Sequence, residues 1–97
     1  MVIELASFKL TEGVHESEFL EAHKTVHEWV KEQKGFVSRK TLCDKEGNWK
    51  DLVTWNSLEE AQRVAEEIGN APGAREWMSK MLPGSISMYH GEIKINF

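Results

Sequence analysis

Hydrophobic side chains alternate between two faces near the start of the chain, and this alternation predicts a β-strand over Val2–Leu10. Ala6 and Phe8 lie on one face and Leu5 lies on the other, so both faces are largely apolar. One layer of helices covers only one face of a sheet. We therefore expect a second sheet, most simply that of an identical subunit, on the other face. Glu4 is unusual because it places a carboxylate on the face that carries Ala6 and Phe8.

The rest of the chain shows helical and strand periodicity in turn. Apolar residues three and four positions apart predict helices, and alternating residues bounded by polar turns predict strands. The predicted helices are Glu16–Lys34, Ser57–Asn70 and Ala74–Leu82, and the predicted strands are Phe36–Leu42, Trp49–Trp55 and Ser85–Phe97. The expected inner stripe of the second helix consists of Leu58, Ala61, Ala65 and Ile68.

Capping and turn residues support these boundaries. Ser17, or a residue one or two positions before it, is expected to begin the first helix, and Gly35 to end it. Gly47 lies in a polar hairpin loop and can take a left-handed conformation. Ser57 and Glu60 form a capping box for the second helix.

The main elements follow one another as strand, helix, strand, strand, helix, strand. This order predicts an α+β protein with a ferredoxin-like βαββαβ fold, an antiparallel sheet and both helices on one face. We expect one domain over residues 1–97, because a chain of this length forms a single modest core.

Charge and cysteine content narrow the classes of partner and compartment. The net charge is −4 and no lysine or arginine cluster is interleaved with aromatic residues, so neither nucleic acid nor a membrane is expected as a partner. The N-terminal residues lack the basic head of a signal peptide, and no apolar run has the length of a membrane span. A single cysteine, Cys43, fits a reducing compartment, and we expect a cytoplasmic protein.

The motifs along the middle of the chain resemble the dimeric α+β barrel superfamily, in particular its antibiotic biosynthesis monooxygenase-like (ABM-like) domains. The resemblance is carried by Gly35-Phe36, Arg39, the alternating Gly47-x-Trp49-x-Asp51-x-Val53-x-Trp55, and Ser57-Leu58-Glu59-Glu60-Ala61. It implies a homodimer in which two sheets meet face to face, with a pocket between each sheet and its helices. Members of the superfamily include cofactor-free oxygenases, haem-degrading enzymes, haem-dependent chlorite-decomposing enzymes, and lactone isomerases and cyclases.

The sequence departs from the haem-degrading branch of this superfamily. That branch uses an asparagine on the first strand and a histidine on the second helix. Here the first strand carries Ser7 and no asparagine, and the second predicted helix contains no histidine. We therefore carry over none of that branch's catalytic residues.

A carboxylate beside a histidine is the first candidate for chemistry. The first and last strands are neighbours in the expected sheet, so Glu4 should lie near His90, and His23 on the overlying helix could face the same space. His23 is our predicted proton acceptor, with Glu4 and His90 as its charge partners, because a carboxylate that orients an imidazole makes a general base. The alternative is a buried pair that has only a structural role.

Large aromatic and sulfur-containing side chains are the second candidate. Such residues can line a pocket for a flat, largely apolar small molecule, although they also build ordinary cores. The predicted ligand-binding residues are Phe8, Trp55, Trp77, Met78, Met81 and Met88. Glycine and proline flank the segment from Asn70 to Gly84, which could act as a lid. Arg39 and Asp51 could instead pair across their strands at the subunit interface.

Glu16, His23 and His27 were weighed as metal ligands, since histidines four apart share a helix face. Two histidines without further motif context are weak support, and we expect no metal. Because there is no phosphate-binding glycine loop either, we expect no cofactor. The family resemblance implies a cofactor-independent monooxygenase or proton-transfer enzyme that acts on a flat apolar small molecule; the alternatives are a non-catalytic or stress-related binding dimer and a haem binder.

Overall fold

The computed structural model describes all residues from Met1 to Phe97. Four strands alternate with three α-helices and one 3₁₀-helix. The elements are β1 (Val2–Phe8), α1 (Glu16–Val30), β2 (Phe36–Cys43), β3 (Trp49–Trp55), α2 (Leu58–Glu67), η1 (Ile68–Asn70), α3 (Ala74–Ser79) and β4 (Ser87–Glu92). The predicted order of strands and helices is confirmed, with η1 added after α2.

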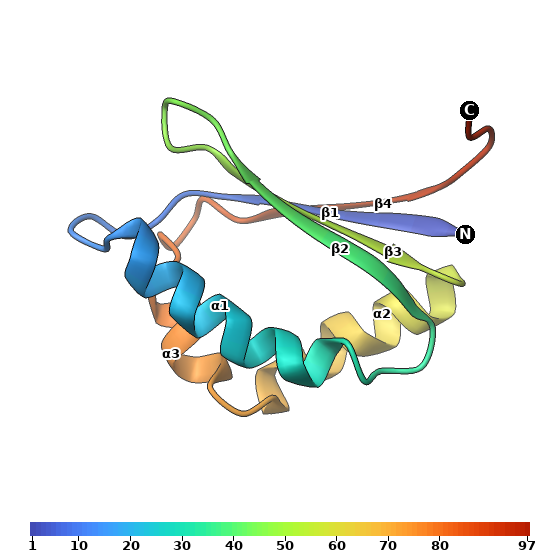
Figure 1. Cartoon of the computed structure of the whole chain (residues 1–97), viewed down its shortest axis with the longest axis horizontal. Coiled ribbons are helices and arrows are strands. Elements are labelled where there is room, and N and C mark those ends of the chain that lie inside the picture. Colours follow the sequence, from blue (N-terminus) through green and yellow to red (C-terminus); the bar gives the residue numbers. More distant parts are fainter.

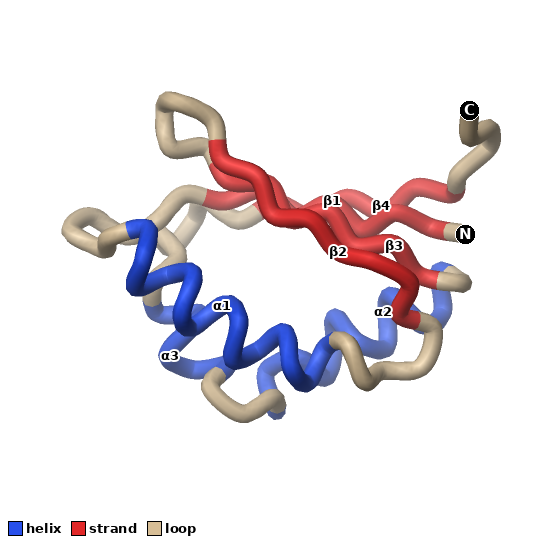
Figure 2. The backbone as a smooth tube through the Cα atoms, viewed as in Figure 1, coloured by secondary structure: helices blue, strands red, loops and turns tan.

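The strands form one antiparallel sheet in the order β2-β3-β1-β4. All helices lie on one face of this sheet, and the other face is bare (Figures 1 and 2). The predicted ferredoxin-like α+β fold is therefore confirmed. None of the helices combines the length and apolar character needed to cross a membrane.

The strand register decides which side chains face the helices. Glu4 of β1 lies opposite Val53 of β3 on one side and opposite His90 of β4 on the other. Since side chains alternate along a strand, these positions share the inner face. The next residue, Leu5, lies opposite Leu52 and Tyr89 on the outer face.

The first helix begins at Glu16 as predicted but ends at Val30, earlier than the predicted Lys34. His15 is its N-cap, and the backbone N–H of His15 donates to the Glu18 carboxylate at 3.4 Å. After Val30 the hydrogen bonds shorten to three-residue spacing, as in Gln33 N–H to Val30 C=O at 3.1 Å, so the last predicted turn is not α-helical. Gly35 then reverses the chain at a φ of +92°.

The second helix is capped as predicted but rotated relative to the predicted stripe. The Glu60 N–H donates to the Ser57 hydroxyl at 3.2 Å. Ala61 and Val64 are buried and Ala65 lines a cavity between the helix and the sheet, whereas Leu58 is 45% exposed, so the prediction was wrong for Leu58. The sequence holds two overlapping apolar stripes, and only packing against the sheet selects one of them.

Strands β4 and β1 both end earlier than predicted. β4 was predicted to reach Phe97, but its ladder with β1 ends where Glu92 lies opposite Val2, and only one further hydrogen bond, from Ile93 N–H to Met1 C=O at 2.9 Å, continues it. β1 was predicted to reach Leu10, but that residue makes only an isolated bridge to Met81. The core between sheet and helices includes fully buried Trp55.

Candidate active site

A cavity of about 330 Å³ lies between the inner face of the sheet and the helices, and thirteen of its sixteen lining residues are hydrophobic. Ligand sites in proteins span about 300–1,000 Å³, so this cavity has the size for a small molecule. All six residues predicted to contact a ligand line it: Phe8, Trp55, Trp77, Met78, Met81 and Met88. Their role as ligand contacts stays a prediction, but the structure brings them together.

The walls of this cavity come from different elements. The strands contribute buried Phe8 and Trp55, and the α3 region contributes buried Trp77. Met78 and Met88 are each 49% exposed, so part of the wall also meets the surface. The indole Nε1 of Trp55 is buried without a hydrogen-bond partner, which is uncommon for a native polar group.

Three charged residues interrupt the apolar lining: Glu4, Arg39 and Asp51. Glu4 Oε2 lies 2.9 Å from His90 Nε2, as the neighbouring strands predicted. Burial raises the pKa of Glu4 above its ordinary value, against the lowering effects of the His90 hydrogen bond and the Arg39 charge. A carboxylate in such a place is a stronger base than one in water.

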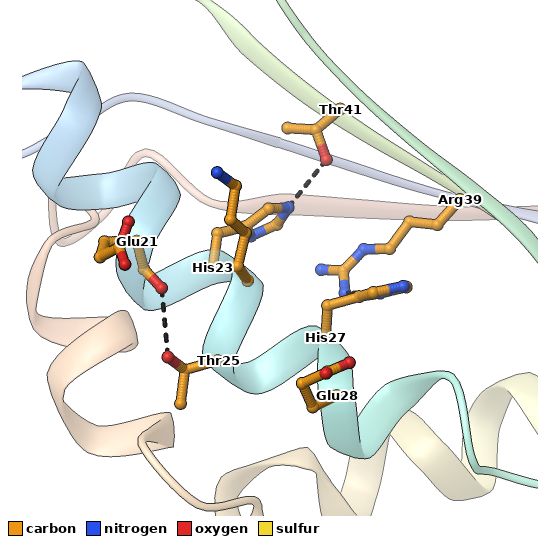
Figure 3. Close-up of a pocket in the computed structure, with 8 residues that line it drawn as sticks. Glu21, His23, Thr25, His27, Glu28, Arg39 and Thr41 are labelled. Carbon is orange, nitrogen blue, oxygen red and sulfur yellow. Dashed lines mark hydrogen bonds between the residues drawn. The ribbon is translucent and has the colours of Figure 1, made fainter.

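The structure places His23 in a different set of contacts from the one predicted. Its Nδ1 accepts a hydrogen bond from Trp77 Nε1 at 3.0 Å, and its Nε2 lies 2.8 Å from Thr41 Oγ1 (Figure 3). Because Nδ1 accepts, the neutral ring carries its proton on Nε2 and donates it to Thr41. Neither bond reaches Glu4 or His90, so the expected three-residue cluster is not formed.

Burial is also the main cause of the low pKa of His23, which falls from 6.5 to about 4. The nearby Arg39 charge acts in the same direction. His23 is only 6% exposed, and both of its nitrogens have partners. Its imidazole therefore holds Trp77 in the cavity wall in the neutral state.

Arg39 and Asp51 form a buried ion pair, with side chains 6% and 9% exposed. Arg39 donates from Nη2 to Asp51 Oδ2 at 2.7 Å and from Nε to Oδ1 at 3.0 Å. The predicted pairing of Arg39 and Asp51 across their strands is therefore present. Both residues face the helices and line the cavity, so the predicted place at the subunit interface was wrong.

This ion pair joins the two histidines of α1 into one network. Arg39 Nη1 donates to His27 Nδ1 at 3.2 Å, and the Thr41 hydroxyl donates to Asp51 Oδ1 at 3.3 Å. Burial and the Arg39 charge lower the pKa of His27 as well. Sequence reasoning missed this link, although alternation puts Arg39 and Thr41 on one face of β2.

A second hollow, of about 550 Å³, lies between α1 and β2 and has no hydrophobic side chain in its lining (Figure 3). Arg39 lines both this polar hollow and the apolar cavity. The polar hollow is open to solvent, and it has no hydrophobic side chain that could pack against a flat molecule. No group of three or more histidine, cysteine, aspartate or glutamate residues lies close enough to hold a metal ion, so Glu16, His23 and His27 do not form one cluster.

No protein-family model matches the sequence, and no curated protein sequence does. Solved structures match over nearly the whole chain. SnoaB from Streptomyces nogalater, described as a cofactor-independent oxygenase, has a TM-score of 0.79 at 14% identity, covering 98% of this chain and 94% of its own. A candidate antibiotic biosynthesis monooxygenase from Bordetella bronchiseptica has a TM-score of 0.74 at 13% identity, covering 97% of each chain.

Rv0793 from Mycobacterium tuberculosis has a TM-score of 0.69 at 11% identity, covering 98% of this chain and 96% of its own. Identities this low show a common fold and leave the activity open. The structural likeness agrees with the resemblance carried by the central motifs of the sequence. The chain has the fold of the antibiotic biosynthesis monooxygenase-like domains.

Proposed function

We propose that the protein binds a flat, largely apolar small molecule in the cavity between sheet and helices and acts on it without a nucleotide or flavin. The observation that carries this proposal is a carboxylate, Glu4, paired with His90 in a largely apolar wall. SnoaB, which shares the fold, is described as a cofactor-independent oxygenase. That description supports oxygenation or a proton-transfer rearrangement as the class of reaction.

In the proposed reaction, Glu4 removes a proton from a hydroxyl group or an activated C–H of the bound molecule. Loss of this proton gives an electron-rich anion, which can rearrange or can transfer electrons to O₂. A positioned general base contributes about 10²- to 10⁴-fold to such a step. His23, our predicted acceptor, would have to release Trp77 to take the proton at Nδ1. We therefore assign the first transfer to Glu4 and leave His23 as a wall-positioning residue.

The test uses 1,4-naphthalenediol, a flat diol with ionisable hydroxyls that reacts with O₂ once deprotonated. Binding is followed by quenching of tryptophan fluorescence, because Trp55 and Trp77 line the cavity. Turnover is followed as O₂ uptake above the protein-free rate. Glu4→Gln should bind the diol and lose at least about 10²-fold in turnover, whereas Glu28→Gln, on the exposed face of α1, should match the wild type.

The same measurements separate the alternative function. A non-catalytic binding protein would quench on titration but would leave O₂ uptake at the protein-free rate in every variant. Equal turnover in Glu4→Gln and the wild type would refute the role of Glu4. His23→Ala measured beside them distinguishes the two candidate acceptors, with circular dichroism as the check that each variant is folded.

We further propose that the protein is a homodimer formed through the bare face of the sheet. On this face Leu5 lies between Leu52 and Tyr89, and Tyr89 is 64% exposed. An apolar patch of this kind marks an interaction surface. Light scattering after gel filtration should give twice the chain mass of 11.1 kDa for the wild type, and a monomer for Leu5→Lys. A monomeric wild type would refute the dimer.

A further inference from the structure

Glu4 and His90 form one hydrogen-bonded pair, yet they border two different hollows. Glu4 lines the apolar cavity. His90 does not line that cavity and instead borders a hollow of about 270 Å³ beside the N-terminus, together with Asn56, Ser57 and Glu92. The pair therefore lies in the partition between a space suited to an apolar ligand and a polar surface hollow.

The chemistry of the two side chains suits transport of a proton through this partition. His90 Nε2 lies 2.9 Å from Glu4 Oε2, and the structure gives His90 Nδ1 no protein partner. The imidazole can therefore accept on one nitrogen and release from the other. The side chains of Glu4 and His90 are 13% and 21% exposed, so the histidine is the more open of the two.

We infer that Glu4 and His90 are a proton relay, which carries a proton from a ligand in the apolar cavity to solvent in the N-terminal hollow. This inference deepens the proposed function and rests on it. It assigns Glu4 the contact with the ligand and His90 the exit step. It also defines the ligand class more closely, as flat molecules that carry an acidic hydroxyl or enol.

Each transfer in the relay balances in atoms and charge. The O–H bond of the ligand breaks and an O–H bond forms on Glu4, leaving the ligand as an anion. The Glu4 O–H then breaks as an N–H forms on His90 Nε2, which restores the carboxylate and gives an imidazolium. The Nδ1–H bond of the imidazolium breaks last, and its proton passes to water. The Nε2–H that remains donates to the ionised Glu4, which is the starting state. A change of tautomer therefore precedes the second transfer: the ring proton moves from Nε2 to Nδ1, which leaves Nε2 free to accept from Glu4.

In the first step Glu4 accepts the ligand proton, and the charges around it affect its pKa. Asp51 disfavours its ionised form, whereas Arg39 and His90 favour that form, and all three influence its pKa alongside burial. Arg39 is held by Asp51 and by His27. On the exit side, Glu92 borders the hollow and is paired with Lys94 at 3.5 Å.

The experiment uses 2-naphthol, a flat photoacid whose hydroxyl becomes strongly acidic when excited, so that its neutral and ionised forms emit at different wavelengths. An apolar cavity excludes the water that normally takes the proton. Naphtholate emission from the bound probe therefore reports a protein acceptor. Excitation at wavelengths longer than tryptophan absorbs keeps the signal specific to the probe.

The relay predicts naphtholate emission in the wild type and its loss in Glu4→Gln, with each protein measured at a probe concentration that saturates its binding. His90→Gln should shorten the naphtholate lifetime, because a proton held on Glu4 returns to the probe. Adding imidazole to His90→Gly should restore the lifetime, which a merely structural pair would not do. His15→Gln, which changes an exposed histidine, should behave as the wild type.

Two other outcomes would overturn the inference. One refutes the relay alone, and the other refutes the proposed function as well. If the probe binds but its emission is the same with and without Glu4 or His90, the relay is wrong and the binding cavity stands. If the probe shows no saturable binding to the wild type, both the relay and the proposed function are wrong. Circular dichroism and thermal unfolding of His90→Gly with and without imidazole exclude rescue through folding.

Discussion

Acidification from pH 7 to pH 4 should destabilise the protein through His23. In the folded protein burial holds the pKa of His23 at about 4, against 6.5 for an exposed histidine. Between these two values the unfolded chain binds a proton that the folded chain does not. The free energy of unfolding therefore falls as the pH falls through this window.

The size of this effect follows from the pKa difference. At about 1.4 kcal/mol for each pH unit, a fall from 6.5 to about 4 corresponds to a loss of about 3 kcal/mol. This loss is a large part of the total free energy of unfolding of a typical domain, which is about 5–15 kcal/mol. His27 has a lowered pKa and acts in the same direction. Glu4 has a raised pKa, so its contribution is present at low pH and is lost as the pH rises through the folded value, which opposes the histidines.

Urea unfolding followed by tryptophan fluorescence measures this effect when wild type and His23→Gln are compared at a series of pH values. Glutamine can still donate to Thr41 but cannot gain a charge. At pH 7 the variant should be less stable by about 1–3 kcal/mol, because Trp77 Nε1 loses its buried acceptor. Between pH 6.5 and pH 4 the wild type should lose about 3 kcal/mol that the variant keeps, so the difference should vanish or change sign.

The comparison isolates His23, because Glu4 and His27 titrate in both proteins. His15→Gln serves as the control, since that histidine is exposed, and it should retain the pH dependence of the wild type. A difference between wild type and His23→Gln that stays constant across the window would refute the reasoning. It would mean that folding does not hold the imidazole neutral.

Three further changes test the packing around the site. Trp77→Phe should cost about 1 kcal/mol in urea unfolding, because it removes the indole N–H that His23 accepts. Arg39→Met or Asp51→Leu alone should cost about 3–5 kcal/mol by leaving a buried charge unpaired, and the double variant should be more stable than either; strict additivity of the two costs would contradict this. Gly35→Ala should lower the melting temperature more than Gly47→Ala, since both have positive φ but only Gly35 lies against the Glu60 side chain; equal losses would argue against that contact.

The sequence by itself determined the order of the elements and the faces of the strands. Alternation is a local property of an extended backbone, so β3 could be predicted from Trp49 to Trp55 without error. The cap at Ser57, whose hydroxyl accepts from the Glu60 N–H, is local for the same reason. Strand order in a βαββαβ fold then places Glu4 beside His90, which is why this pair could be predicted.

Whether apolar residues enclose a cavity or fill a core depended on the tertiary structure. The six large side chains could be chosen from the sequence because they are bulky and apolar. Their placement around one space follows from the height and rotation of the helices over the sheet, which periodicity does not define. The same rotation exposed Leu58 and buried Val64.

Only the tertiary structure decided the network of His23. Its partners lie on β2 and α3, which are distant in the sequence and approach His23 only when α1 packs against both. The end of β4 was likewise decided by the last residue that β1 could offer as a partner. Patterns along the chain report what each segment can bury, whereas contacts between segments depend on how the segments pack.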